Sequence, residues 1–141
     1  MKTSLVLIII FIFSGICCHA QVSDSLKYTV LSAKEFQKGY SGNPDAVLID
    51  SRDYKDYKKA RIKGAINILW PIPDNYFSGP DAPAKDKSIY VYCYAGHRSL
   101  KVSIIFYDHG YRNIYSLKGG FDGWRLKKME VDKKKIKTKG L

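Results

Sequence analysis

The residue in this chain best placed to do chemistry is Cys93. It ends an apolar, β-branched and aromatic run, residues 88–93, and a short loop that contains Gly96 follows at once. A helical pattern begins directly behind this loop. The backbone N–H groups of such a loop, together with the partial positive charge of a helix N-terminus, stabilise a thiolate. Most isolated cysteines are inert core residues, but this setting favours a nucleophile.

The spacing between Cys93 and Arg98 narrows the range of reactions that Cys93 could perform. Four residues separate them, and Gly96 among these can take a positive φ without steric cost, so the loop is tight. Arg98 supplies a fixed cation for an anionic substrate. The phosphate-wrapping loop of cysteine phosphatases has one residue more, and a shorter ring of amides suits a single terminal sulfur atom better. The spacing therefore indicates sulfur transfer rather than phosphoryl transfer.

Several segments in order along the chain resemble the rhodanese-like sulfurtransferases. Residues 89–99 resemble the family's active-site strand and loop, and residues 110–124 resemble its closing strand and short helix. Upstream, residues 47–52 and 61–67 are similar to its early Asp-x-Arg and Gly-Ala-x-Asn signatures. Ordered matches of this kind are far more specific than any one motif. One departure is Arg61, which stands where the family often has a histidine, so the local turn or hydrogen bond of that histidine must be replaced.

The resemblance implies a rhodanese-like α/β fold, a parallel β-sheet with helices on both faces. The alternation of strand and helix patterns along the chain predicts the same architecture, because crossovers between parallel strands are right-handed and carry helices. Ligands of such sheets bind beyond the carboxyl ends of the strands, where Cys93 lies. We expect strands near residues 27–30, 46–50, 66–69, 88–93 and 114–117, and helices near residues 32–40, 53–60 and 99–109.

We expect Cys93 to be the catalytic residue and the loop behind it to bind the substrate. The expected substrate-binding residues are Tyr94, Ala95, Gly96, His97, Arg98 and Ser99, whose amides ring the terminal sulfur of a Cys93 persulfide. Arg98 either steers the anionic donor or braces the loop. His97 is expected to be an exposed loop side chain, because a thiolate held by amides needs no base. No metal or organic cofactor is required.

Asp50 and Arg52 have two interpretations. The favoured one is a structural ion pair, or a set of hydrogen bonds that anchors the loop at the end of a strand. The alternative places Arg52 at the rim of the substrate pocket.

The N-terminal segment, residues 1–20, has the pattern of an export signal. Lys2 precedes an apolar run at residues 5–13, and small residues lead to Ala20, after which we expect cleavage. The run is too short to span a bilayer, which takes about 20 residues. The predicted location is therefore periplasmic or secreted. The less favoured alternative is a lipoprotein acylated at Cys17 or Cys18.

Cleavage would leave Cys93 as the one cysteine of the mature chain, because Cys17 and Cys18 depart with the signal. A mature chain of this kind forms no internal disulfide. Redox exchange is disfavoured because no second cysteine is available to resolve a mixed disulfide. A lone thiol in an oxidising compartment is easier to understand as a functional group than as packing.

The chain carries a formal net charge of +11, and much of the excess is near its C-terminus. We divide the remainder into a rhodanese-like domain at residues 26–127 and a basic tail at residues 128–141. The tail is expected to be a solvated, frayed end, with weak contact to a membrane surface or an acidic protein as the alternative. No nucleic-acid-binding motif is present, so nucleic acid is not an expected partner.

The sequence thus predicts a sulfurtransferase. It moves a sulfane sulfur from a small anionic donor, thiosulfate or a persulfide, to a thiol or cyanide acceptor through a Cys93 persulfide. The alternative is a rhodanese-like sulfur carrier or partner-binding module that does not turn over small acceptors.

Overall fold

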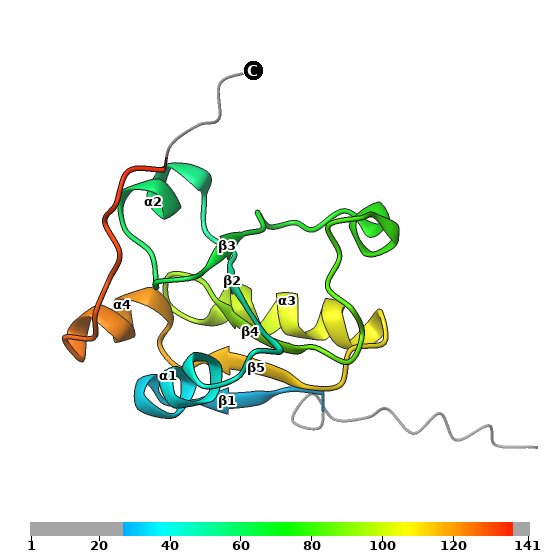
Figure 1. Cartoon of the computed structure of the whole chain (residues 1–141), viewed down its shortest axis with the longest axis horizontal. Helices are drawn as coiled ribbons and strands as arrows, with labels where there is room; N and C mark the ends of the chain where they lie inside the picture. The colour runs from blue at the N-terminus through cyan, green and yellow to red at the C-terminus, as the bar shows by residue number, and fades with distance from the viewer. Residues whose placement is uncertain (1–26, 137–141) are drawn as a thin grey trace, which may run out of the picture.

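The computed structural model describes residues 27–136, and the expected export segment 1–20 lies outside the described residues. Its sheet has five parallel strands in the order β1-β5-β4-β2-β3 (Figure 1). The strands are β1 (Thr29–Leu31), β2 (Ala46–Asp50), β3 (Ile66–Asn67), β4 (Ser88–Tyr92) and β5 (Ile114–Leu117). The helices are α1 (Ala33–Ser41), α2 (Tyr54–Lys59), α3 (His97–Asp108) and α4 (Gly120–Leu126), with a 3₁₀ helix at Asp74–Ser78.

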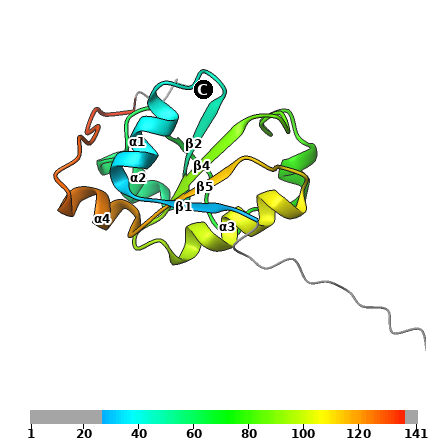
Figure 2. The same ribbon diagram turned by 90° about the horizontal axis from the view of Figure 1, so that it is seen from below.

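Helices cover both faces of the sheet, as predicted. The ribbon views place α1 and α3 on opposite sides of the strands (Figures 1 and 2). The central strand β4 alternates between the two resulting cores. Tyr90 and Tyr92 face the core that contains α1 and α4, whereas Ile89 and Val91 face the core that contains α3 and the 3₁₀ helix. Within residues 27–136, no helix is long and apolar enough to cross a membrane.

Local sequence signals set most of the element ends. The Ser32 hydroxyl and the Glu35 carboxylate form the expected capping box at the start of α1. The helix α3 ends before Gly110, whose φ is +93°, as expected of a glycine stop. It begins at His97, two residues earlier than predicted, because Gly96 takes a left-handed conformation and turns the chain straight into the helix.

The proline-rich segment 70–84 contains the 3₁₀ helix that the sequence did not predict. Phe77 from this helix is buried, and its ring stacks on His109 at 3.8 Å between centroids and packs edge-to-face on Phe106. The segment is therefore packed onto α3 by its aromatic side chain.

The expectation of a frayed end beginning at residue 128 is wrong for the part of the tail that the structure describes. Residues 128–136, here called the C-terminal strap, lie against the domain. Asp132 and Arg61 exchange two backbone hydrogen bonds of 2.8 and 3.0 Å, and their side chains form an ion pair at 3.0 Å. The Trp124 indole donates to the Glu130 carbonyl at 2.8 Å. Met129 and Val131 pack onto the core that contains α1 and α4.

A buried ion pair stands at the carboxyl end of β2. The Arg52 guanidinium lies 2.7 Å from the Asp50 carboxylate, and the two side chains are only 2% and 0% exposed. Arg52 also donates to the Ala60 carbonyl at 2.7 Å and lies 3.8 Å above the Phe121 ring. These contacts confirm the structural interpretation of the pair, and Arg52 does not lie at the rim of the pocket beside Cys93.

Replacing Arg52 by leucine should destabilise the protein by about 3–5 kcal/mol, because it leaves the Asp50 carboxylate buried without its cation. The measurement is the free energy of unfolding in urea. Lys87→Met is the matched control, since it breaks an ion pair with Asp45 at the surface and should cost less than about 1 kcal/mol. Equal losses of unfolding free energy in the two variants would contradict the structural role of the Asp50–Arg52 ion pair.

Candidate active site

The loop after β4 holds Cys93 with its sulfur almost fully buried. The residue is 3% exposed. Its Sγ accepts hydrogen bonds from the backbone N–H of Gly96 at 3.2 Å and from that of Ser99 at 3.4 Å. Two of the six expected loop amides therefore contact the thiol sulfur itself. The contact of the remaining amides with an outer sulfur stays a prediction.

The first turn of α3 presents its positive end to this sulfur. Gly96 is the N-cap residue with φ of +101°, a conformation that side chains rarely adopt. Ser99 lies in the first turn, where the backbone N–H groups have no partner within the helix. Negative charge on Sγ is therefore stabilised both by direct hydrogen bonds and by the helix dipole.

Three buried serines form a hydrogen-bonded group behind the sulfur. The Ser99 hydroxyl lies 3.8 Å from Cys93 Sγ and donates to the Gly96 carbonyl at 2.8 Å. Ser116 on β5 donates to the Ser99 hydroxyl at 2.9 Å, and Ser103 on α3 donates to the Ser99 carbonyl at 2.9 Å. Sequence reasoning missed Ser103 and Ser116. The sequence signal that could have indicated them is a small polar residue at a position where the apolar pattern of a strand or helix predicts burial.

Arg98 braces the loop against the end of β2. Its guanidinium donates to the Ser51 carbonyl at 3.1 Å and lies 3.8 Å from the Asp53 carboxylate. About a third of the side chain is exposed, at 34%. Of its two expected roles, the structure confirms the bracing, and contact with the substrate stays a prediction.

Tyr94 ties the loop to α2. Desolvation, reinforced by a hydrogen bond to the Asp56 carboxylate, raises the pKa of Tyr94 to about 12. The same hydrogen bond lowers the pKa of the Asp56 carboxyl. At neutral pH the phenol is therefore protonated and the carboxylate is charged, so the two side chains attract each other between the loop and α2.

The predicted site residues gather around one small depression. Its volume is about 180 Å³, and Cys93, Tyr94, Ala95, His97 and Arg98 line it. Gly96 and Ser99 lie beneath it and contact the sulfur. His97 is exposed, as expected. Among residues 27–136, no group of three or more histidine, cysteine or carboxylate side chains is arranged to hold a metal ion.

The first turn of α4 holds the loop from the other side. The N–H of Phe121 donates to the Cys93 carbonyl at 2.7 Å, and the N–H of Asp122 donates to the Tyr94 carbonyl at 3.0 Å. Because the N–H and C=O of a trans peptide point in opposite directions, these bonds turn the amides of Tyr94 and Ala95 away from α4. The close contact between α4 and the loop requires a glycine at position 120, because a Cβ on Gly120 would collide with the carbonyl oxygens of Cys93 and Tyr94.

Gly120→Ala should therefore displace the loop and reduce the turnover of any reaction at Cys93 by about 100-fold, the usual effect of a shift near 1 Å. Gly110→Ala is the matched control, because Gly110 also has a positive φ but has open space where the added Cβ would lie. The comparison is made by steady-state kinetics at a temperature where circular dichroism finds both variants folded. Equal activities in the two variants would contradict a role for the α4 contact.

The chain matches known proteins over the same elements that build this site. The rhodanese-like domain family matches residues 32–127. The chain is 31% identical over 90 residues to the thiosulfate sulfurtransferase GlpE of Glaesserella parasuis, and this match covers 64% of this chain and 81% of the relative. It is 33% identical over 81 residues to the protein of the same name from Coxiella burnetii, and this match covers 57% of this chain and 73% of the relative.

A solved structure has the same fold. The solution structure of the rhodanese-like domain of the Anabaena protein Alr3790 superimposes with a TM-score of 0.61 at 22% identity, covering 78% of this chain and 83% of that one.

Proposed function

Because this chain belongs to the rhodanese-like domain family, we propose that it is a sulfurtransferase whose Cys93 carries sulfur as a persulfide. The relatives named thiosulfate sulfurtransferase support sulfur transfer as the general class of reaction. The observation that carries the proposal is the pair of loop amides on Cys93 Sγ, backed by the first turn of α3. A sulfur so placed is suited to hold negative charge through both halves of a reaction cycle.

In the first half-reaction, the Cys93 thiolate attacks the outer sulfur of thiosulfate. A new S–S bond forms at Cys93, the S–S bond of the donor breaks, and sulfite leaves with the bonding electron pair. The enzyme keeps one sulfur as a persulfide anion. A persulfide donor reacts in the same way, with a thiolate as the leaving group.

In the second half-reaction, a nucleophilic acceptor attacks the outer sulfur of the Cys93 persulfide. Cyanide gives thiocyanate and an acceptor thiolate gives a new persulfide, and each restores the Cys93 thiolate. During this cycle the negative charge moves outward from Sγ to the outer sulfur and back. The N–H groups of Gly96 and Ser99 serve the inner position, and we assign the outer position to the amides of the pocket-lining residues Ala95, His97 and Arg98.

Incubation with thiosulfate should add the mass of one sulfur atom to the intact protein, because the loop stabilises the persulfide, and cyanide should remove it. Peptide mapping should locate the addition at Cys93. Cys93→Ser should gain no sulfur and should lower thiosulfate:cyanide activity to the uncatalysed rate. A wild-type protein that gains no sulfur from thiosulfate, persulfide or polysulfide donors would overturn the proposal.

The same preparation separates an enzyme from a carrier. A carrier would acquire the persulfide but return sulfur to cyanide and small thiols at a negligible rate. Sustained thiocyanate production therefore supports the sulfurtransferase.

We further propose that the protein is exported, on the pattern of residues 1–20 alone. Export should yield a mature chain that begins at Gln21 when the protein is recovered from its native cells. A protein that keeps all of residues 1–20 would contradict export, whereas an acylated Cys17 or Cys18 at the mature N-terminus would replace cleavage after Ala20 by the lipoprotein alternative.

A further inference from the structure

We propose that a lysine-rich surface beside the active site docks an acidic protein that carries the sulfur donor or acceptor group. This inference rests on the proposed function and specifies its partner. The surface, here called the lysine face, belongs to α2, the turn after it and the C-terminal strap. Its exposed members are Lys55, Lys58, Lys59, Lys63, Lys133, Lys134 and Lys135.

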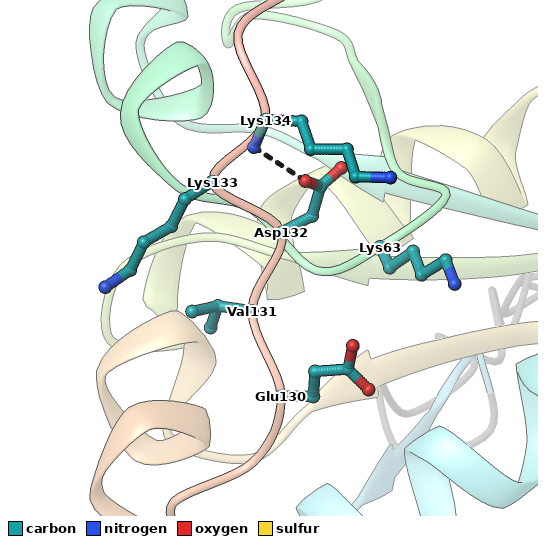
Figure 3. Close-up of a pocket in the computed structure, with 6 residues that line it drawn as sticks. All are labelled: Lys63, Glu130, Val131, Asp132, Lys133 and Lys134. Carbon is teal, nitrogen blue, oxygen red and sulfur yellow. Dashed lines mark hydrogen bonds between the residues drawn. The ribbon is translucent and has the colours of Figure 1, made fainter.

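The lysine face is hollowed at two places, both walled by the strap. One hollow, of about 400 Å³, is lined by Lys135 and Ile136 together with three lysines of α2. The other, of about 390 Å³, is lined by Lys63 and by strap residues 130–134. In Figure 3, Lys63 and Lys134 extend to one side of the strap and Lys133 to the other. An extended acidic segment would therefore meet ammonium groups on both sides of the strap.

The strap holds its lysines in place through specific contacts. The Arg61 guanidinium donates to the Lys134 carbonyl at 3.0 Å as well as to the Asp132 carboxylate, and the Lys134 amide donates to Asp132 at 2.8 Å. A run of lysines is usually a solvated end whose charges move independently. Here the backbone is fixed on both sides of Asp132, so these positive charges are presented together.

Three carboxylates near the lysine face are matched within the molecule, and the exposed Glu130, which lines the second hollow, adds one negative charge to it. Asp132 pairs with Arg61, and Asp56 accepts a hydrogen bond from Tyr94 and lies 3.7 Å from Lys59. Asp53 lies 3.8 Å from Arg98. The unpaired positive charge therefore exceeds the unpaired negative charge, and the surface should attract acidic partners.

The lysine face is coupled to the catalytic loop through α2. The Tyr94 phenol interacts with the Asp56 carboxylate on this helix, and the Arg98 guanidinium lies 3.8 Å from the Asp53 carboxylate at its N-terminus. The depression at Cys93, of about 180 Å³, has room for a reacting group but offers little area for binding. A protein held by the neighbouring lysines would supply that binding energy while its sulfur enters the depression.

The chemistry of the site favours a protein over a lipid surface. Cys93 directly follows β4 and α2 follows β2, so both belong to the carboxyl-end side of the sheet, whereas the described chain enters at the opposite end, before β1 (Figure 1). A lipid surface on the lysines would lie beside the depression and contribute no sulfur to it. A protein with acidic residues around a thiol or persulfide satisfies both the charge and the reaction.

The test measures sulfur transfer from the persulfide-loaded protein to two synthetic thiol peptides. One has glutamates around its cysteine, and the other has glutamines at the same positions. The second-order rate constant for the acidic peptide should exceed that for the neutral peptide by about tenfold at low salt, and the ratio should fall toward one as salt screens the charges.

The triple variant Lys55→Gln, Lys58→Gln, Lys135→Gln should bring the ratio close to one. The matched control, Lys34→Gln, Lys38→Gln, Lys101→Gln, removes the same number of exposed lysines from α1 and α3 and should keep the preference. A wild-type ratio near one, or equal losses in the two triple variants, would overturn the docking proposal. A protein that never loads sulfur would instead overturn the proposed function, so the two failures are distinguishable.

Sedimentation with phosphatidylserine vesicles and titration with a single-stranded oligonucleotide complete the test. Both should bind the lysine-face variant and the control variant alike, because each variant has lost three positive charges. Binding that is lost in the lysine-face variant, without a preference for the acidic peptide, would replace the protein partner by that class of ligand.

Discussion

Two backbone hydrogen bonds from α4 to the catalytic loop are the constraint on which the site depends. They fix the carbonyls of Cys93 and Tyr94 on the side of Phe121 and Asp122, so the amides that follow these carbonyls point the other way. The arrangement leaves no room for a side chain at Gly120. A peptide segment nearly 30 residues downstream of the nucleophile thus orients the dipoles around it.

The electrostatics of the site depend on the matching of the three aspartates at the end of β2 to local partners. Three aspartates lie within a short stretch at the end of β2, and each is neutralised or hydrogen-bonded. Asp50 is paired with Arg52, Asp53 with Arg98, and Asp56 with the Tyr94 phenol. Because these carboxylates are matched, little of their charge opposes a thiolate at Cys93. The amides and the α3 dipole then determine the local potential at the sulfur.

The features that the sequence predicted are those with a local signal. The capping box at Ser32, the strand that delivers Cys93 and the tight loop around Gly96 each depend on neighbours in the chain. The strap was missed because its anchor joins Arg61 to Asp132, which are 71 positions apart. No propensity or periodicity reports such a contact, although Arg61 in place of the family's usual histidine marked the position.

The serines behind the sulfur illustrate a second limit of prediction from the sequence. Ser99 was expected to act through its amide, which donates to Cys93 Sγ, but its hydroxyl also accepts a hydrogen bond from Ser116 on β5. That pairing depends on the register between β5 and the start of α3, which no single-sequence pattern specifies. The hydroxyls are fully buried and hydrogen-bonded, so they set the orientation of the loop from below.

The most direct test of the persulfide cradle is a crystal structure of the protein after loading with thiosulfate. We expect the outer sulfur on Cys93 to occupy the depression within hydrogen-bonding distance of the amides of Ala95, His97 or Arg98, with the α4 contacts unchanged. An outer sulfur that points into solvent, or that contacts side chains and no loop amide, would contradict the assignment of these peptide groups.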